Sequence, residues 1–144
     1  MNVTEFMTQP VVTVEMDDSL LEVKSLFEKT SFHHLLVISD SELVGVISDR
    51  DLLKVLSPNI GTAAETLKDL ACLNKRAHQI MSRDPITLKP DARLPEVVSV
   101  FNQHTISCIP IVDDSNAVLG IVSWRDVMKT LGLAYAKAAT KPQF

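Results

Sequence analysis

Two short motifs combine a hydroxyl, a cation and a carboxylate, and each follows an apolar stretch. Residues 45–51 read GVISDRD and residues 120–126 read GIVSWRD. Ser-x-x-Asp before an apolar helix has the spacing of a capping box, in which the two residues exchange side-chain to backbone hydrogen bonds. The free N–H groups of a helix start also suit a phosphate, with Arg50 or Arg125 beside it, and the carboxylate can accept hydrogen bonds from ribose hydroxyls. Capping and ligand binding are both compatible with this pattern.

The motifs occupy corresponding places in an internal repeat, in which residues 7–56 match residues 81–131. Matching positions differ by 74 residues in the first part of each copy and by 75 from Gly45 and Gly120 onward. Each copy predicts the order β-α-β-β-α: an extended segment, a helix with one apolar face, two short apolar strands and a second helix. We therefore expect an α/β (α+β) fold in which strands deliver both motifs to helix starts.

The predicted strands lie at 12–14, 35–38 and 43–48 in the first copy and at 86–88, 109–112 and 118–123 in the second. Between the copies, Thr62 and Glu65 have capping-box spacing and are followed by apolar residues at helical intervals. We predict a first domain at 1–60, a connecting amphipathic helix at 61–80 and a second domain at 81–144. The last helix is expected to continue past Gly132 to a short tail from Thr140.

Composition limits the class of partner. The chain has 14 Lys and Arg against 18 Asp and Glu, a net charge of -4, so no overall positive field attracts nucleic acid or an anionic membrane. The apolar runs are strand-sized, far below the roughly 18 residues of a membrane span, and the acidic N-terminus does not read as a signal peptide. We expect a cytoplasmic protein. Cys72 and Cys108 stand far apart, which supports neither a zinc framework nor a disulfide scaffold.

Catalytic signatures are missing from the sequence. It contains no nucleophile elbow, Walker loop, dinucleotide fingerprint or zinc-protease motif. We therefore expect that the protein is not an enzyme and requires no cofactor.

The β-α-β-β-α repeat, ending in Gly-apolar-apolar-Ser-x-x-Asp, resembles a pair of CBS domains, also called a Bateman module, over about residues 6–133. Residues 57–62, 69–71 and 74–81 are similar to the branch of acetoin-utilisation B proteins. The resemblance implies tandem CBS domains related by a pseudo-two-fold axis, with two clefts between them. It further implies an adenine nucleotide as ligand.

The resemblance also implies which residues surround that ligand. In this family the motif Asp holds ribose, the Ser or Thr contacts ribose or phosphate, and backbone of the first strand and of the Ile-Pro strand surrounds the base. Carried over by position, one cleft uses Ser123, Asp126, Thr87, Ile86, Ile109 and Pro110, and Arg125 stands beside it at the helix start. The other cleft uses Ser48, Asp51, Thr13, Val12, Leu35 and Leu36.

His33 and His34 stand where some family members carry a basic residue that reaches the phosphate in the opposite cleft. Consecutive residues of a strand point to opposite faces, so only one of the two can face a given ligand. No carboxylate or Cys lies beside them at ligand spacing, and we predict no metal site. Phosphate contact and a strand-edge histidine in solvent or at an interface both remain open.

The two clefts differ in sequence. Leu36 stands where the second copy has Pro110, and Asp49 stands where it has Trp124. Asp49 adds a second carboxylate to the first motif, and a like charge near a phosphate opposes binding. We therefore expect the better anion site at Asp126, with the two histidines opposite it.

Two functions remain open. One is a sensor that binds an adenine nucleotide and signals to an unknown regulated protein. The alternative is a ligand-free dimerisation or protein-interaction module, whose motifs only cap helices. Under either function, the apolar residues of the final helices, Val55, Leu56, Val127, Met128 and Leu131, predict a homodimer.

Overall fold

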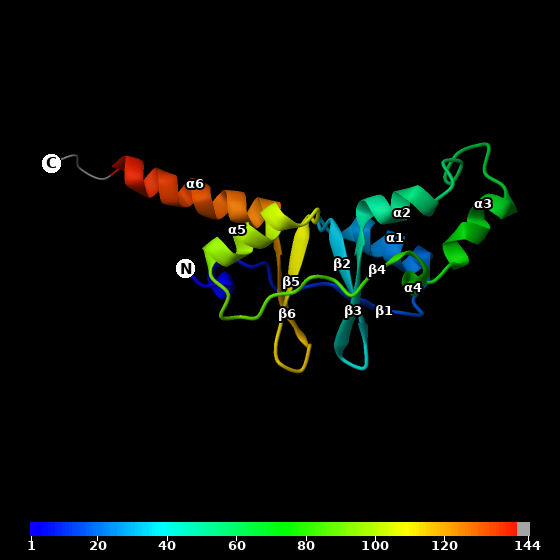
Figure 1. Ribbon diagram of the computed structural model, residues 1–144. Coiled ribbons are helices and arrows are strands. Elements are labelled where there is room, and N and C mark those ends of the chain that lie inside the picture. The colour runs from blue at the N-terminus through cyan, green and yellow to red at the C-terminus, as the bar shows by residue number, and fades with distance from the viewer. Residues whose placement is uncertain (141–144) are drawn as a thin grey trace. The chain divides into compact units, whose positions relative to one another are not determined.

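The computed structural model describes residues 1–140, so the predicted tail beyond Thr140 lies outside the described residues. The chain forms two compact units, one of residues Val12–Pro85 and one that joins Met1–Val11 to the residues from Ile86 onward (Figure 1). This division differs from the contiguous domains expected at 1–60 and 81–144. The reason is that each sheet is completed by the first residues of the other copy of the repeat.

The Val12–Pro85 unit contains a four-stranded sheet in the order β1-β2-β3-β4. Strand β1 (Thr13–Glu15) is parallel to β2 (His34–Ser39), which pairs antiparallel with β3 (Glu42–Ser48), and β4 (Ser82–Arg83) pairs antiparallel with β3. Between β2 and β3, Asp40 and Ser41 have φ angles of 51° and 67°, the left-handed pair that a tight two-residue hairpin requires. The predicted strands are therefore confirmed to within one residue at most ends.

Two helices cover this sheet. Helix α1 (Leu20–Lys29) begins at Ser19, whose Oγ accepts the Glu22 N–H, and α2 (Asp49–Val55) follows β3 directly. Apolar residues at helical spacing on α1 meet alternate strand residues in the core, which includes Leu20, Val23, Leu35, Val37 and Ile47, all fully buried. The helix periodicity read from the sequence thus matches the buried face.

The helix predicted at 61–80 is wrong as one element. The structure has α3 (Leu67–Ala71), the 3-10 turn η2 (Cys72–Asn74) and α4 (Ala77–Ile80) instead. Lys75 and Arg76 are extended because their backbone pairs with the segment before α1: Leu20 N–H donates to the Lys75 carbonyl at 2.8 Å, and Arg76 bridges Ser19. These tertiary hydrogen bonds interrupt the helix.

The second unit repeats the same plan around the hairpin of β5 (Cys108–Val112) and β6 (Val118–Ser123). Helices α5 (Leu94–Gln103) and α6 (Trp124–Thr140) pack against it, and α6 continues through Gly132 as the apolar pattern predicts (Figure 1). The strand predicted at 86–88 is not formed: a single bridge joins Leu88 to Ile111, and another joins Thr8 to Ile121. These bridges match the β1–β2 and β3–β4 pairings of the first unit.

A methionine crosses the same strand glycine in each unit. A Cβ added at Gly45 would lie 2.5 Å from Met81 Sδ, and one added at Gly120 would lie 2.5 Å from Met7 Sδ. Real Cβ atoms do not approach a neighbour so closely, because packing in a protein core is already dense. Both motifs therefore begin with glycine because the incoming segment needs the space.

Candidate functional site

The Asp126 carboxylate is held by three groups in its own unit. Its Oδ2 accepts the Ser123 N–H at 2.9 Å and the Ser123 hydroxyl at 3.2 Å, while the Asp126 N–H donates to Ser123 Oγ at 3.3 Å. The Thr8 hydroxyl lies 3.0 Å from Oδ1 and 3.1 Å from Oδ2. The carboxylate is half-buried at the start of α6. A carboxylate offers about four acceptor positions, so room remains for a ligand hydroxyl.

The first motif forms the same box without the equivalent of Thr8. Ser48 N–H donates to Asp51 Oδ2 at 2.9 Å, and Asp51 N–H donates to Ser48 Oγ at 3.1 Å. The position that matches Thr8 is Ser82, which is exposed in β4. Both motifs are therefore closed capping boxes, as the local spacing predicts, and only the second is tied to a distant segment.

Thr8 is a residue that the sequence reasoning missed. It lies 118 positions from Asp126 and enters the unit on the leading segment Met1–Val11. The available signal was its repeat partner, since both Thr8 and Ser82 carry a hydroxyl directly after the methionine that crosses a motif glycine.

The second unit has Pro110 where the first has Leu36, and this replacement removes a hydrogen bond to a backbone carbonyl. In the first unit the Leu36 N–H donates to the Val12 carbonyl at 3.2 Å. Proline has no N–H, so Pro110 cannot make the corresponding hydrogen bond to the Ile86 carbonyl. The Ile86 oxygen is therefore available at this position to a donor other than the neighbouring strand. Pro110 itself is buried, and its carbonyl accepts the Leu88 N–H at 3.1 Å.

Asp49 and Trp124 have different local partners. Asp49 Oδ2 lies 2.8 Å from His33 Nδ1, and the Asp49 N–H donates to the His33 carbonyl. Trp124 stacks at a tilt on Phe101, with 5.5 Å between ring centroids, and its indole N–H donates to the Ile106 carbonyl at 3.0 Å. The second carboxylate of the first motif thus contacts a histidine inside its own unit.

The two histidines are in different environments. His33 is exposed, whereas His34 is half-buried as the first residue of β2. Burial lowers the pKa of His34, and His33 adds to that effect, while Asp49 and Asp51 act in the opposite direction. Across residues 1–140, no group of three or more His, Cys, Asp and Glu side chains could hold a metal ion.

The remaining predicted site residues are divided between the two units. Thr13 opens β1 opposite Leu36, and Leu35 and Leu36 are buried in β2. In the second unit Ile86 and Thr87 precede the Leu88 bridge to β5, Ile109 is buried in β5, and Arg125 is exposed in the first turn of α6. Each unit therefore brings together its own motif, first-strand backbone and apolar strand.

A family model described as the CBS domain matches residues 3–58 and 77–133. Among curated relatives, protein MJ1225 of Methanocaldococcus jannaschii is 27% identical over 128 residues, which is 88% of this chain and 46% of the relative. This chain spans less than half the length of the first curated relatives it matches.

Solved structures share the fold. The CBS domain pair of protein MJ0100, in complex with 5′-methylthioadenosine and S-adenosyl-L-methionine, is 27% identical, with a TM-score of 0.77 over 93% of this chain and 98% of that chain. A Vibrio cholerae protein assigned to acetoin utilization (AcuB) has a TM-score of 0.77 at 23% identity, covering 99% and 98% of the two chains. The latter likeness shows a common fold with the acetoin-utilisation B branch, to which the sequence was found similar.

None of the helices within residues 1–140 has both the length and the hydropathy of a bilayer-crossing segment.

Proposed function

Because the chain belongs to the CBS domain family, we propose that it is a regulatory module that binds an adenosine-containing ligand, an adenine nucleotide or a close relative. One observation carries the proposal. The CBS pair of MJ0100, which matches nearly the whole of this chain at 27% identity, binds two adenosine derivatives. Binding would shift the packing of the module, and a partner protein would respond to that shift.

In this proposal the ligand binds best at the second motif. The Asp126 carboxylate accepts a ribose hydroxyl, and Thr8 and Ser123 hold that carboxylate in position. The Ile86 carbonyl accepts an N–H of the base, because Pro110 leaves that acceptor without the bond that Leu36 makes in the first unit. Thr87 and Ile109 would complete the surroundings of the ligand, and Arg125 would attract a phosphate at the start of α6.

Ser48, Asp51 and Thr13 form a second, weaker candidate set. Asp51 is held by Ser48 of its own capping box, and the Val12 carbonyl is already bonded to Leu36. His33 and His34 remain candidates for contact with a phosphate. For His33 this requires its contact with Asp49 to open.

A second candidate function is supported by the closed capping boxes. Both motifs satisfy their helix starts without any ligand, as a purely structural or protein-interaction module requires. A thermal-shift panel of AMP, ADP, ATP, 5′-methylthioadenosine and S-adenosylmethionine separates the two functions. A ligand present at 100 times its Kd raises the free energy of unfolding by about 2.7 kcal/mol, and the melting temperature rises with it. If the module binds no ligand, none of these compounds changes the melting temperature.

Calorimetry with Asp126→Ala then tests the placement of the ligand. A hydrogen bond to a charged group contributes about 1.5 to 3 kcal/mol, so the affinity should fall roughly tenfold to over a hundredfold. Asp69→Ala is a matched control, because Thr66 and Asp69 form a capping box of the same geometry at α3, outside both motifs. Equal affinities for wild type and Asp126→Ala would refute the placement at the second motif.

We further propose that two copies associate through α6. Its residues Met128, Leu131, Tyr135 and Ala138 recur at alternating intervals of three and four, the spacing of a coiled-coil seam. Met128 and Tyr135 are 61% and 72% exposed, while Val127, one of the residues predicted at the interface, is buried in its own unit. Light scattering should show a dimer for wild type and a monomer for Tyr135→Glu; a wild-type monomer would reject the interface.

A further inference from the structure

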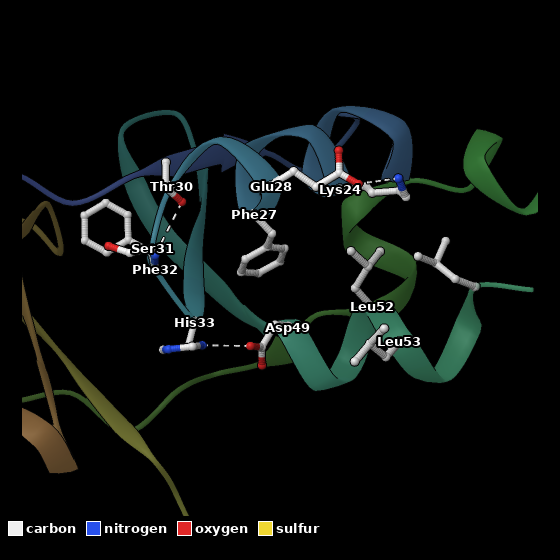
Figure 2. A pocket seen from close by; sticks show the side chains of 11 residues that line it. Lys24, Phe27, Glu28, Thr30, Ser31, Phe32, His33, Asp49, Leu52 and Leu53 are labelled. Atoms are coloured by element: carbon white, nitrogen blue, oxygen red, sulfur yellow. Dashed lines mark hydrogen bonds and ion pairs between the residues drawn. The ribbon is translucent and has the colours of Figure 1, made fainter. Parts of the chain in front are cut away.

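A cavity of about 310 Å³ lies inside the Val12–Pro85 unit, between α1 and α2 (Figure 2). Its walls are largely apolar and include Phe27, Phe32, Leu52, Leu53 and Leu56. Sites for small molecules have volumes from about 300 Å³ upward and are lined in the same way, with a few polar groups. The size and the lining both suit a small organic ligand.

Two pairs of charged side chains stand at the edges of this cavity. Figure 2 shows the His33–Asp49 pair at one edge, the Lys24–Glu28 pair at another and the Phe27 ring between them. Asp49 is 41% exposed and could therefore meet a ligand directly. The cavity shares no residue with the Ser48 and Asp51 capping box.

The second unit has a tryptophan at the position that corresponds to Asp49. In the repeat, Phe27, Phe32 and Asp49 correspond to Phe101, Ile106 and Trp124. The Trp124 ring packs on Phe101, and its indole N–H donates to the Ile106 carbonyl. The Trp124 ring, which is 52% exposed, thus packs on Phe101, whereas in the first unit the corresponding Phe27 lines an open cavity and an aspartate stands in place of the tryptophan.

We propose that this cavity binds a small planar aromatic molecule of indole size, with an N–H donor and no negative charge. The ring stacks on Phe27 as Trp124 stacks on Phe101, and the N–H donates to the Phe32 carbonyl or to Asp49. The lining holds two carboxylates, those of Asp49 and Glu28, against one lysine, Lys24, and a histidine, His33, that is charged only when protonated. This balance disfavours an anionic ligand and favours a cationic substituent. The site is therefore separate from the nucleotide motifs and takes a different class of ligand.

Calorimetry with tryptamine, indole and indole-3-acetate tests this proposal. We expect the wild type to bind tryptamine most tightly and indole-3-acetate at least tenfold more weakly. Asp49→Trp supplies the missing ring from the chain itself, so its tryptamine affinity should fall at least tenfold. Arg50→Trp is the matched control, because it adds the same side chain one position away at an exposed site that does not line the cavity.

A second variant keeps the proposal testable if Asp49→Trp does not fold. That variant is Leu53→Lys, because Leu53 is 70% exposed and a lysine there should not prevent folding. The new cation lies on the cavity wall and should weaken the binding of cationic tryptamine severalfold. No tryptamine binding by wild type, or equal binding by Asp49→Trp, would overturn the proposal. Binding of 5′-methylthioadenosine should be the same in wild type and Asp49→Trp.

Discussion

Gly120→Ala is the sharpest test of how the leading segment joins the second unit. The new Cβ would lie 2.5 Å from Met7 Sδ, 3.0 Å from its Cγ and 3.1 Å from its Cε. Favourable contacts between such atoms lie at about 3.5 to 4.0 Å, so three consecutive side-chain atoms must each move by up to about 1 Å. These atoms are the flexible end of a half-buried side chain that can move aside, so the cost should lie at the lower end of the range for overpacking, about 1 kcal/mol.

The assay is urea unfolding followed by the fluorescence of Trp124, the single tryptophan, which lies in the same unit as Gly120. At about 4 °C per kcal/mol, the melting temperature should also fall by roughly 4 °C. Gly132→Ala is the matched control, because a Cβ there meets nothing within 4 Å in the middle of α6. That change should stabilise the protein by up to about 1 kcal/mol, since alanine favours a helix more than glycine does.

A double-mutant cycle with Met7→Ala identifies the partner. If Met7 causes the clash, the double variant Met7→Ala, Gly120→Ala should unfold at nearly the urea concentration of Met7→Ala alone. Residues in direct contact show coupling energies of about 0.5 to 3 kcal/mol, whereas independent sites add within about 0.5 kcal/mol. Additive effects would refute the contact between Met7 and Gly120, and with it the account of the motif glycine.

Three further measurements follow from the structure. Thr8→Val removes the hydroxyl that donates to Asp126 and should destabilise the protein by about 1.5 to 3 kcal/mol in chemical denaturation, whereas Ser82→Ala at the corresponding position should have little effect. Burial lowers the pKa of folded His34, so the unfolded chain takes up the proton first; stability should fall as pH drops below about 6.5, and His34→Gln should flatten this slope in pH-dependent unfolding. Burial raises the pKa of Cys108 to about 12, so iodoacetamide should label it at pH 9 far more slowly in the folded protein than in urea, and equal rates would contradict its burial.

Much of the fold was predictable because the relevant interactions are local. Alternation of apolar residues located β2 and β3, and the Ser48 and Asp51 spacing predicted a capping box that the structure confirms. The connecting helix at 61–80 was predicted wrongly for the opposite reason. Its interruption at Lys75 depends on a hydrogen bond to Leu20, which lies 55 residues away in the chain.

The candidate site, too, was predictable where its interactions are local and unpredictable where they are not. The chemistry of Ser123 and Asp126 follows from their spacing at a helix start, and the effect of Pro110 on the Ile86 carbonyl follows from the missing N–H once the strands are paired. The hydrogen bond from Thr8 to Asp126 could not be derived from spacing, since 118 residues separate them.

The sequence by itself determined the repeat, the elements of each copy and the two motifs, because helix caps, turns and periodic apolar faces depend on neighbouring residues. Only the tertiary structure decided that each leading segment completes the unit of the other copy, through Met7 at Gly120 and Met81 at Gly45. It also decided that Trp124 packs on Phe101, whereas Phe27, at the corresponding position, lines a cavity beside Asp49. Such contacts depend on the path of the chain through space, and no local pattern specifies that path.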